Sequence, residues 1–449
     1  MKLKLVVASM SVLGLVSCPV FAATTTTYKH HHHKHHHQVA HQDYKDMGAL
    51  PYKDQPACMI SQNSMIMTDM SQNDGRSLPN PCNPGWFNRI AMSGGVNVDI
   101  GKFGNRNQNF MGENYQRVSL NDAYLNLSAD VNEWAKAFAS LSYSNPTIST
   151  AQATSTGNAV NSEYSAAYTN NIGSDDHSDV QLEQAYATLG NMDESPFFVQ
   201  VGKYYQDFGR YEIHPITRSL TQSMSETLAT ALGVGFLTNG FSGQVYAFDN
   251  PINKVGQNST TTNYGAALGY NKISDSLGWD IGAGYLNNLT GANDVAFIVN
   301  QRNETATASN AGYNTRTGGG AVYADVNSGP FSIGARYTQA LQRFNATDLP
   351  QNTGSTTGAK PWAVGIQAGY GFDAFSRNNN LYVGYQESHQ SAKLNLPQYR
   401  WLAGYGVDVL GKNTNVGIEW DHDSAYSTGN GGTGNTYNLV SLRSTVKFG

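Results

Sequence analysis

The sequence predicts an all-β fold: a transmembrane antiparallel β-barrel of about 16 strands with a short periplasmic N-terminal extension. Three observations support this class. From Trp86 onward, apolar and polar residues alternate in runs of about ten, the length of a membrane-crossing strand. The connections between these runs alternate between long and short, and the short ones include Ser274–Gly278 and Asp373–Asn380. The last run has one apolar face and ends on Phe448, and closure onto the first strand would protect its edge from aggregation.

The composition narrows the class of protein further. The chain has 449 residues, of which 14% are charged, and a formal charge of −5. Beyond the N-terminus no segment reaches about 18 consecutive apolar residues, so no transmembrane helix is expected. A closed barrel is then the structure that satisfies the backbone in lipid. The acidic balance argues against a nucleic-acid partner, which requires a basic surface.

Residues 1–22 are predicted to be a secretory signal peptide. Two lysines precede an apolar core at 5–16, and a small-x-small cleavage site ends at Ala22. A lipoprotein signal with a lipidated Cys18 is the alternative, and Pro19 directly after that cysteine argues against it.

Residues 23–43 form a His-rich, low-complexity segment. Neutral imidazoles bind divalent transition metals, so weak metal capture is one interpretation, and an inert spacer is the other. Lys34 within the tract and its position behind the signal argue against an affinity tag. No other cofactor is expected. The histidines concerned are His30, His31, His32, His33, His35, His36 and His37.

Residues 44–85 are polar and proline-rich, and we interpret them as a periplasmic extension. Cleavage after Ala22 leaves two cysteines, Cys58 and Cys82. Cysteines in an oxidising compartment are normally paired, so we expect a disulfide, with two isolated thiols as the alternative.

Residues 86–449 are predicted to form the barrel. The first strand and the last strand carry the clearest alternation, because in each the apolar residues occupy every second position. Tyrosines recur at strand ends in Gly-Tyr pairs, which suits the interface between lipid and water. The apolar faces are Ile90, Met92, Val96, Val98 and Ile100 in the first strand, and Val440, Leu442, Val446 and Phe448 in the last.

The connection between the fifth and sixth strands is the most charged one. In 16-stranded porins the equivalent loop commonly folds into the lumen, where mixed charge selects solutes. A selectivity loop is therefore one hypothesis, and His214, with an ordinary pKa near 6.5, would add positive charge on acidification. The other is a loop whose ions pair and brace the wall. Its candidate residues are Asp207, Arg210, Glu212, His214, Arg218 and Glu226.

A second group lies near the end of the fifteenth strand. Carboxylates beside a histidine at a barrel rim are able to activate water, hold a cation or cap a loop. No serine or cysteine stands in a recognisable nucleophilic setting, so we expect no enzyme, and an outer-membrane hydrolase is the weakest alternative. The group consists of Glu419, Asp421, His422 and Asp423.

Several stretches resemble the LbtU-type siderophore porins of gamma-proteobacteria. The resemblance rests on NPCNPGWFNRI ending at Ile90, GENYQRVSLNDAYLN (112–126), GRYEIHPITRS (209–219), DVNSGPF (325–331) and GIEWDHDSAYS (417–427). It implies an outer-membrane barrel that takes up ferric siderophore without energy-coupling machinery.

The predicted length agrees with passive passage. About 60 residues separate the signal from Trp86, too few for the plug of a 22-stranded receptor. The expected partners are outer-membrane lipid, a small solute and the barrel-assembly machinery. A monomer and a homotrimer both remain open. A structural or adhesive barrel is the main alternative to a transport pore.

Overall fold

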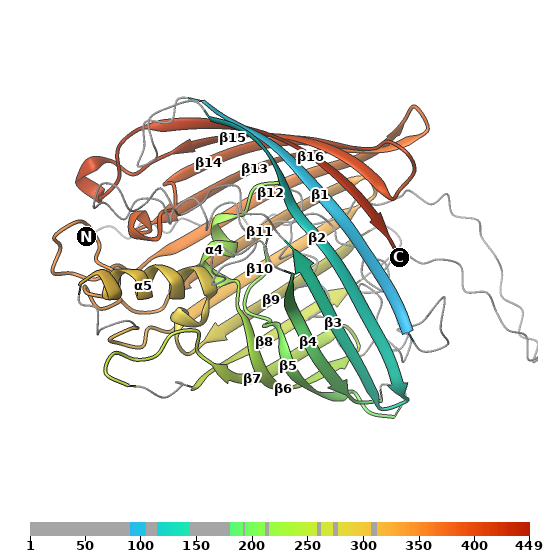
Figure 1. Cartoon of the computed structure of the whole chain (residues 1–449), viewed down its shortest axis with the longest axis horizontal. Helices are drawn as coiled ribbons and strands as arrows, with labels where there is room; N and C mark the ends of the chain where they lie inside the picture. Colours follow the sequence, from blue (N-terminus) through green and yellow to red (C-terminus); the bar gives the residue numbers. More distant parts are fainter. Residues whose placement is uncertain are drawn as a thin grey trace, which may run out of the picture.

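Sixteen antiparallel strands close into one barrel (Figure 1). The computed structural model describes residues 90–104, 115–143, 180–191, 194–211, 215–257, 262–272, 277–306 and 312–449. Each strand pairs with its neighbours in sequence, and the first strand pairs with the last, Gly94 opposite Phe448. The predicted all-β barrel of about 16 strands is confirmed. The predicted signal, His-rich segment and extension, with Cys58 and Cys82, lie outside the described residues.

The strands and helices have the following bounds. The strands are β1 (Ile90–Gly104), β2 (Tyr115–Asn132), β3 (Ala135–Tyr143), β4 (Gln181–Leu189), β5 (Phe197–Tyr205), β6 (Leu228–Thr238), β7 (Phe241–Asp249), β8 (Thr262–Lys272), β9 (Gly278–Leu286), β10 (Gly319–Ser328), β11 (Phe331–Ala340), β12 (Trp362–Ala374), β13 (Arg377–His389), β14 (Tyr399–Asp408), β15 (Thr414–Ser424) and β16 (Thr436–Phe448). Among the described residues the helices are α4 (Leu220–Ser225) and α5 (Asn293–Ala306), with short 3-10 turns η3 (Leu289–Gly291), η4 (Ala392–Leu394) and η5 (Thr428–Asn430). Among the helices that the structure describes, none is long and apolar enough to cross a membrane.

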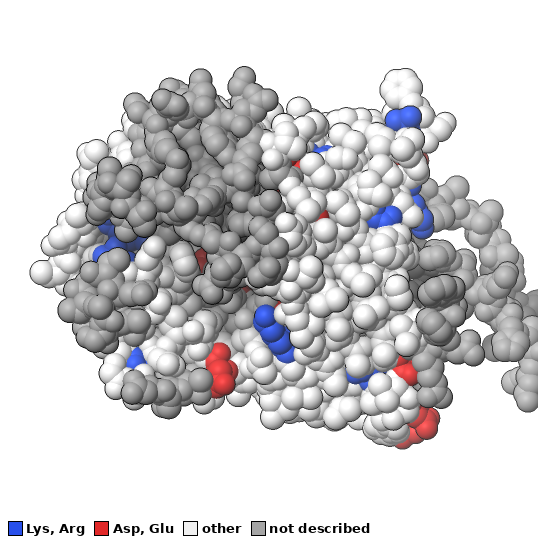
Figure 2. Space-filling model, in the orientation of Figure 1, with Lys and Arg blue, Asp and Glu red and all other residues white. Residues whose placement is uncertain are grey.

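Alternation along each strand separates an apolar outside from a polar inside. In β16, Leu442 and Val446 face outward, 37% and 54% exposed, while Ser441, Arg443 and Thr445 are buried on the inner face. Successive side chains on a strand point to opposite faces, so the predicted pattern gives this result directly. On the face that Figure 2 shows, the described residues carry few Lys, Arg, Asp or Glu side chains.

The connections sort to the two ends of the barrel as predicted. Links after even-numbered strands have two to seven residues, and links after odd-numbered strands have nine to 37. One predicted link, Asp373–Asn380, is wrong: β12 and β13 continue through it to a two-residue turn. That turn is Phe375 and Ser376, whose φ angles of 54° and 58° are those of a tight hairpin turn.

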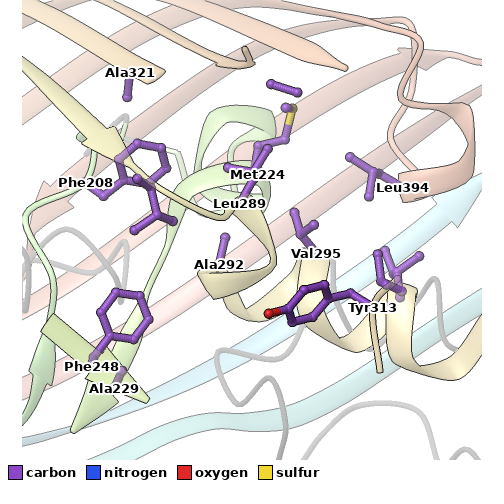
Figure 3. Packing of buried hydrophobic residues seen from close by; sticks show 14 of the residues in the cluster. Phe208, Met224, Ala229, Phe248, Leu289, Ala292, Val295, Tyr313, Ala321 and Leu394 are labelled. Atoms are coloured by element: carbon purple, nitrogen blue, oxygen red, sulfur yellow. The ribbon is translucent and has the colours of Figure 1, made fainter. Parts of the chain in front are cut away.

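Four long loops pack together inside the long-loop end of the barrel. We name them L3 (206–227), L5 (287–318), L6 (341–361) and L7 (390–398), after their order in the chain. Their buried apolar side chains form one cluster around α5, part of which Figure 3 shows. The cluster includes Phe208, Leu220 and Met224 of L3, Leu289, Ala292, Val295 and Val299 of L5, Phe344 and Leu349 of L6, and Leu394 of L7.

Candidate functional site: the loop that crosses the lumen

L3 leaves β5 and reaches inward-facing residues on the far wall. Arg210, near its start, is buried and pairs with the carboxylate of Asp280 on β9. Its guanidinium also lies 4.4 Å from the ring centre of Tyr323 on β10. Burial alone would lower the pKa of Arg210, but Asp280 and the neighbouring acidic groups outweigh it and raise the pKa above its ordinary value. Arg210 therefore stays a cation, with its charge matched inside the barrel.

Three arginines of the wall hold the backbone of L3. Each donates a hydrogen bond to a main-chain carbonyl of the loop, so the contact depends on the loop's path and not on its side chains. The bonds run from Arg336 on β11 to Tyr211 (3.3 Å), from Arg443 on β16 to Ile216 (3.5 Å) and from Arg400 on β14 to Arg218 (2.8 Å).

Each of these arginines is also paired with an aspartate of the adjacent strand. The donor–acceptor distances are 2.6 Å for Arg336–Asp325, 2.7 Å for both bonds of Arg400–Asp423 and 2.8 Å for both bonds of Arg443–Asp99. A forked guanidinium matches a carboxylate in two parallel bonds, which fixes its plane. Arg400 and Arg443 each make two such bonds and are therefore pre-oriented toward the loop, whereas Arg336 is held by one bond to Asp325.

Carboxylates of β15 bind the middle of the loop. Glu419 accepts the backbone N–H groups of Ile216 (2.7 Å) and Thr217 (2.8 Å), and the Thr217 hydroxyl contacts both Glu419 and Asp421. Tyr382 on β13 donates to the same glutamate at 2.8 Å. On β13, the side-chain oxygen of Gln386 accepts the N–H of Leu220 at 2.9 Å. L3 is thus bonded to the wall from β9 to β16.

The group on β15 is divided between the two faces of the strand. Glu419, Asp421 and Asp423 are buried on the lumen side. The intervening His422 lies on the opposite face, stacked 6.0 Å from Trp420 and 3.0 Å from the side-chain oxygen of Asn438. The histidine and the carboxylates therefore do not form a joint acid–base pair.

The end of L3 carries a buried group of three charges. Arg218 lies 2.9 Å from Glu226 and 3.2 Å from Asp294, which belongs to the first turn of α5. Gln222 donates to Glu226 at 2.6 Å. Burial raises the pKa of Asp294 to about 7, with Arg218 acting to lower it and Glu226 to raise it.

The predicted loop residues therefore fall into two sets. Asp207, Arg210, Arg218 and Glu226 are buried, whereas Glu212 and His214 lie outside the described residues. The role of these residues in solute selection stays a prediction. Sequence reasoning missed the wall residues that hold the loop, although their inward positions on alternating strands were a usable signal. These residues are Arg336, Gln386, Arg400 and Arg443.

Sequence comparisons find relatives of this chain in two bacteria. No protein-family model matches the chain. A UPF0422 protein of Coxiella burnetii is 28% identical over 256 residues, 56% of this chain and 53% of the relative. A UPF0422 protein of Legionella pneumophila strain Paris is 25% identical over 321 residues, 69% of this chain and 54% of the relative. The chain spans about half the length of the relatives it matches.

Solved structures share the fold. OprB of Pseudomonas putida superposes with a TM-score of 0.54 and 12% identity, covering 80% of this chain and 94% of that one. The outer membrane channel DcaP of Acinetobacter baumannii gives a TM-score of 0.50 and 12% identity, with 80% and 97% covered. OmpF of Salmonella typhi gives 0.50 and 14%, with 80% and 97% covered. At this identity the likeness shows the fold, a barrel of the outer-membrane porin type.

Proposed function

We propose that this porin-type barrel is a passive channel of the outer membrane for a small solute. The observation that carries the proposal is L3, which crosses the interior and is bonded to the wall from β9 to β16. A loop fixed across a lumen narrows it, and the charges around the constriction act on the passing solute. The resemblance to siderophore porins makes a ferric siderophore the proposed solute.

In this proposal, L3 controls passage in two ways. Its backbone, held by wall arginines and Glu419, sets the width. Its charged residues, with Glu212 and His214 among them, set the potential. Arg210 and Arg218 act from within ion pairs, because both are buried. Removing them leaves several carboxylates unmatched and should make the passage more favourable to cations.

Conductance in planar bilayers tests the proposal. We expect stable open steps for the purified protein, and a shift of reversal potential toward cation selectivity for the double variant Arg210→Ala/Arg218→Ala. The exposed Arg377, at the β12–β13 turn, supplies the matched control Arg377→Ala, which should keep the parent's selectivity. If the double variant folds and selects ions as the parent does, L3 only braces the wall.

Uptake of labelled ferric siderophore tests the solute. Cells that contain the protein should accumulate the chelate faster than cells that lack it. Passage across the outer membrane is passive in this proposal, so the difference should persist in the first phase of uptake when the inner membrane is de-energised. A channel that conducts ions but gives no difference in uptake would keep the pore and remove the siderophore.

A structural or adhesive barrel is a second candidate, favoured by the apolar loop cluster in the long-loop end. Residues such as Leu289, Val295 and Leu349 are fully buried there, so much of that end is filled by protein. Such packing would serve a barrel that displays loops and passes nothing. Correctly folded protein that gives no steps over a wide voltage range would support this candidate.

A further inference from the structure

The first turn of α5 is bonded to the residues that directly follow α4, inside the barrel mouth. The N–H of Asn293 donates to the carbonyl of Glu226 at 2.9 Å, and the side-chain oxygen of Asn293 accepts the N–H of Leu228 at 2.7 Å. Met224 and Val295 are buried in the same apolar cluster (Figure 3). L5 is thereby joined to L3, the loop that crosses the lumen.

The contact between α4 and the first turn of α5, which we call the seam, contains charges that do not balance. One guanidinium, Arg218, is shared by two carboxylates, Glu226 and Asp294, and all three side chains are at most 4% exposed. When both acids are ionised, a net negative charge is buried between the helices. A buried charge without a full partner is costly, so the seam favours a state in which one acid carries a proton.

The other groups that the structure describes near the seam do not supply the missing positive charge. Tyr211 and Asp207 interact with the same cluster from L3, and Ser223 of α4 donates to Asp294. The segment η3 has no titratable side chain, and Lys393 of η4 donates to Thr353 of L6. The positive, N-terminal end of the α5 dipole stabilises an ionised Asp294, and it lowers the pKa of this group by less than about one unit.

We propose that this seam is an acid-closed latch: α5 stays seated on α4 while Asp294 is protonated, and ionisation of Asp294 releases it. Release of α5 would loosen L5 from L3 and widen the mouth of the channel. The regulatory meaning of the latch rests on the proposed channel function, whereas the latch itself does not.

Linkage gives the direction and the pH window. Burial raises the pKa of Asp294 from its ordinary 3.8 to about 7 in the seated state. A released, hydrated Asp294 has the lower value, so the seated state is fully favoured below about pH 4. Its advantage falls about tenfold per pH unit up to about pH 7 and is constant above. The channel therefore closes in acid and opens toward neutral pH.

Amide hydrogen exchange of α5 tests the latch without using conductance. In the purified protein in lipid nanodiscs, we expect protection factors of the α5 amides, corrected for intrinsic rates, to be up to about 100-fold higher at pH 5 than at pH 7.5. Asp294→Asn should keep the high protection at both pH values. Asp408→Asn is the matched control: its carboxylate binds Asn378 and Asn415 at the short-turn end of the wall, away from α5, so this variant should keep the parent's protection and its pH dependence.

A second variant keeps the test decisive if Asp294→Asn does not fold. Glu226→Gln leaves Arg218 to Asp294 alone, so the pH dependence of protection should move to lower pH. Protection in the parent that is equal at both pH values overturns the latch. So does a pH dependence that survives in Asp294→Asn, or one that does not move in Glu226→Gln.

Conductance separates the latch from the channel. Open probability should rise from pH 5 to pH 7.5 in the parent and stay low in Asp294→Asn. A protein whose α5 protection changes as expected but which never conducts would keep the latch and refute the channel. A protein that conducts with no change in α5 protection would keep the channel and refute the latch.

Discussion

The two sides of the barrel wall hold the interior by different means. On the charged side, β9 to β16 with β1, inward-facing Arg–Asp pairs and Glu419 bind the backbone of L3. On the aromatic side, β3 to β8, inward rings pack against one another: Phe138 and Tyr186 are 5.1 Å apart, and Tyr186 and Tyr204 are 5.6 Å apart. The difference teaches that the loop's position is specified by directional bonds on one side and by contact area on the other.

Energetically the two sides should respond differently to substitution. A buried ion pair adds little compared with apolar packing, yet removal of one partner leaves an unmatched charge and costs several kcal/mol. A buried ring loses mainly contact when it is trimmed. Removal of a polar group should therefore lower the free energy of unfolding more on the charged side than on the aromatic side.

The largest effect is expected for Arg400→Ala. It leaves the carboxylate of Asp423 buried with the Tyr437 hydroxyl as its remaining donor among the described residues, and it removes the bond to the carbonyl of Arg218. We expect the free energy of unfolding to fall by about 3–5 kcal/mol. Urea unfolding in phospholipid vesicles measures it, with the exposed Arg377→Ala as control. A loss below about 1 kcal/mol would refute the anchoring role of this pair.

A smaller effect is expected for Gln386→Met, which removes the acceptor for the N–H of Leu220 at the start of α4. An unsatisfied buried donor costs about 1–3 kcal/mol. Gln367→Met, an inward glutamine on the neighbouring strand β12, is the control, because its side-chain oxygen accepts no hydrogen bond from the described residues. Equal losses in the two variants would show that the bond to L3 contributes nothing.

The barrel wall could be predicted from the sequence more fully than the contacts of L3. Alternation alone places Leu442 outside and Arg443 inside, because the side-chain period of a strand is fixed by its backbone. The Phe375–Ser376 turn gave no signal, since tight hairpin turns normally use Asn or Gly at positive φ. The surrounding Asn378 and Asn380 read as loop residues but belong to the ladder.

The loop's charged residues were visible in the sequence, but their partners were not. Arg336, Arg400 and Arg443 bind main-chain carbonyl groups of L3. Every residue has such a carbonyl, so the sequence does not show which ones accept these bonds. The seam between α4 and α5 joins Arg218 to Asp294, 76 residues away. Contacts of this kind follow from the closed barrel, which brings distant loops into one mouth, and so they needed the structure.

A still smaller effect is expected for Lys136→Met, on the aromatic side of the barrel. Lys136 pairs with Asp130 at 2.7 Å, but the aspartate side chain is 35% exposed and the pair does not touch L3. Ion pairs that water reaches contribute about 0–1 kcal/mol. We expect a loss in that range by urea unfolding, and one that shrinks in high salt. A loss as large as that of Arg400→Ala would show that the sides do not differ.

The smallest effect is expected for Tyr246→Phe on β7. The ring is buried beside Phe248, 6.1 Å away, and its hydroxyl has no hydrogen-bond partner among the described residues. Removing an unsatisfied buried hydroxyl should leave stability unchanged or raise it by up to about 1 kcal/mol. Tyr382→Phe on the charged side is the matched change: its hydroxyl donates to Glu419 at 2.8 Å, so its removal should cost about 1–3 kcal/mol. If both variants lose the same stability, the Tyr246 hydroxyl is bonded after all, and the aromatic side is held by polar bonds as the charged side is.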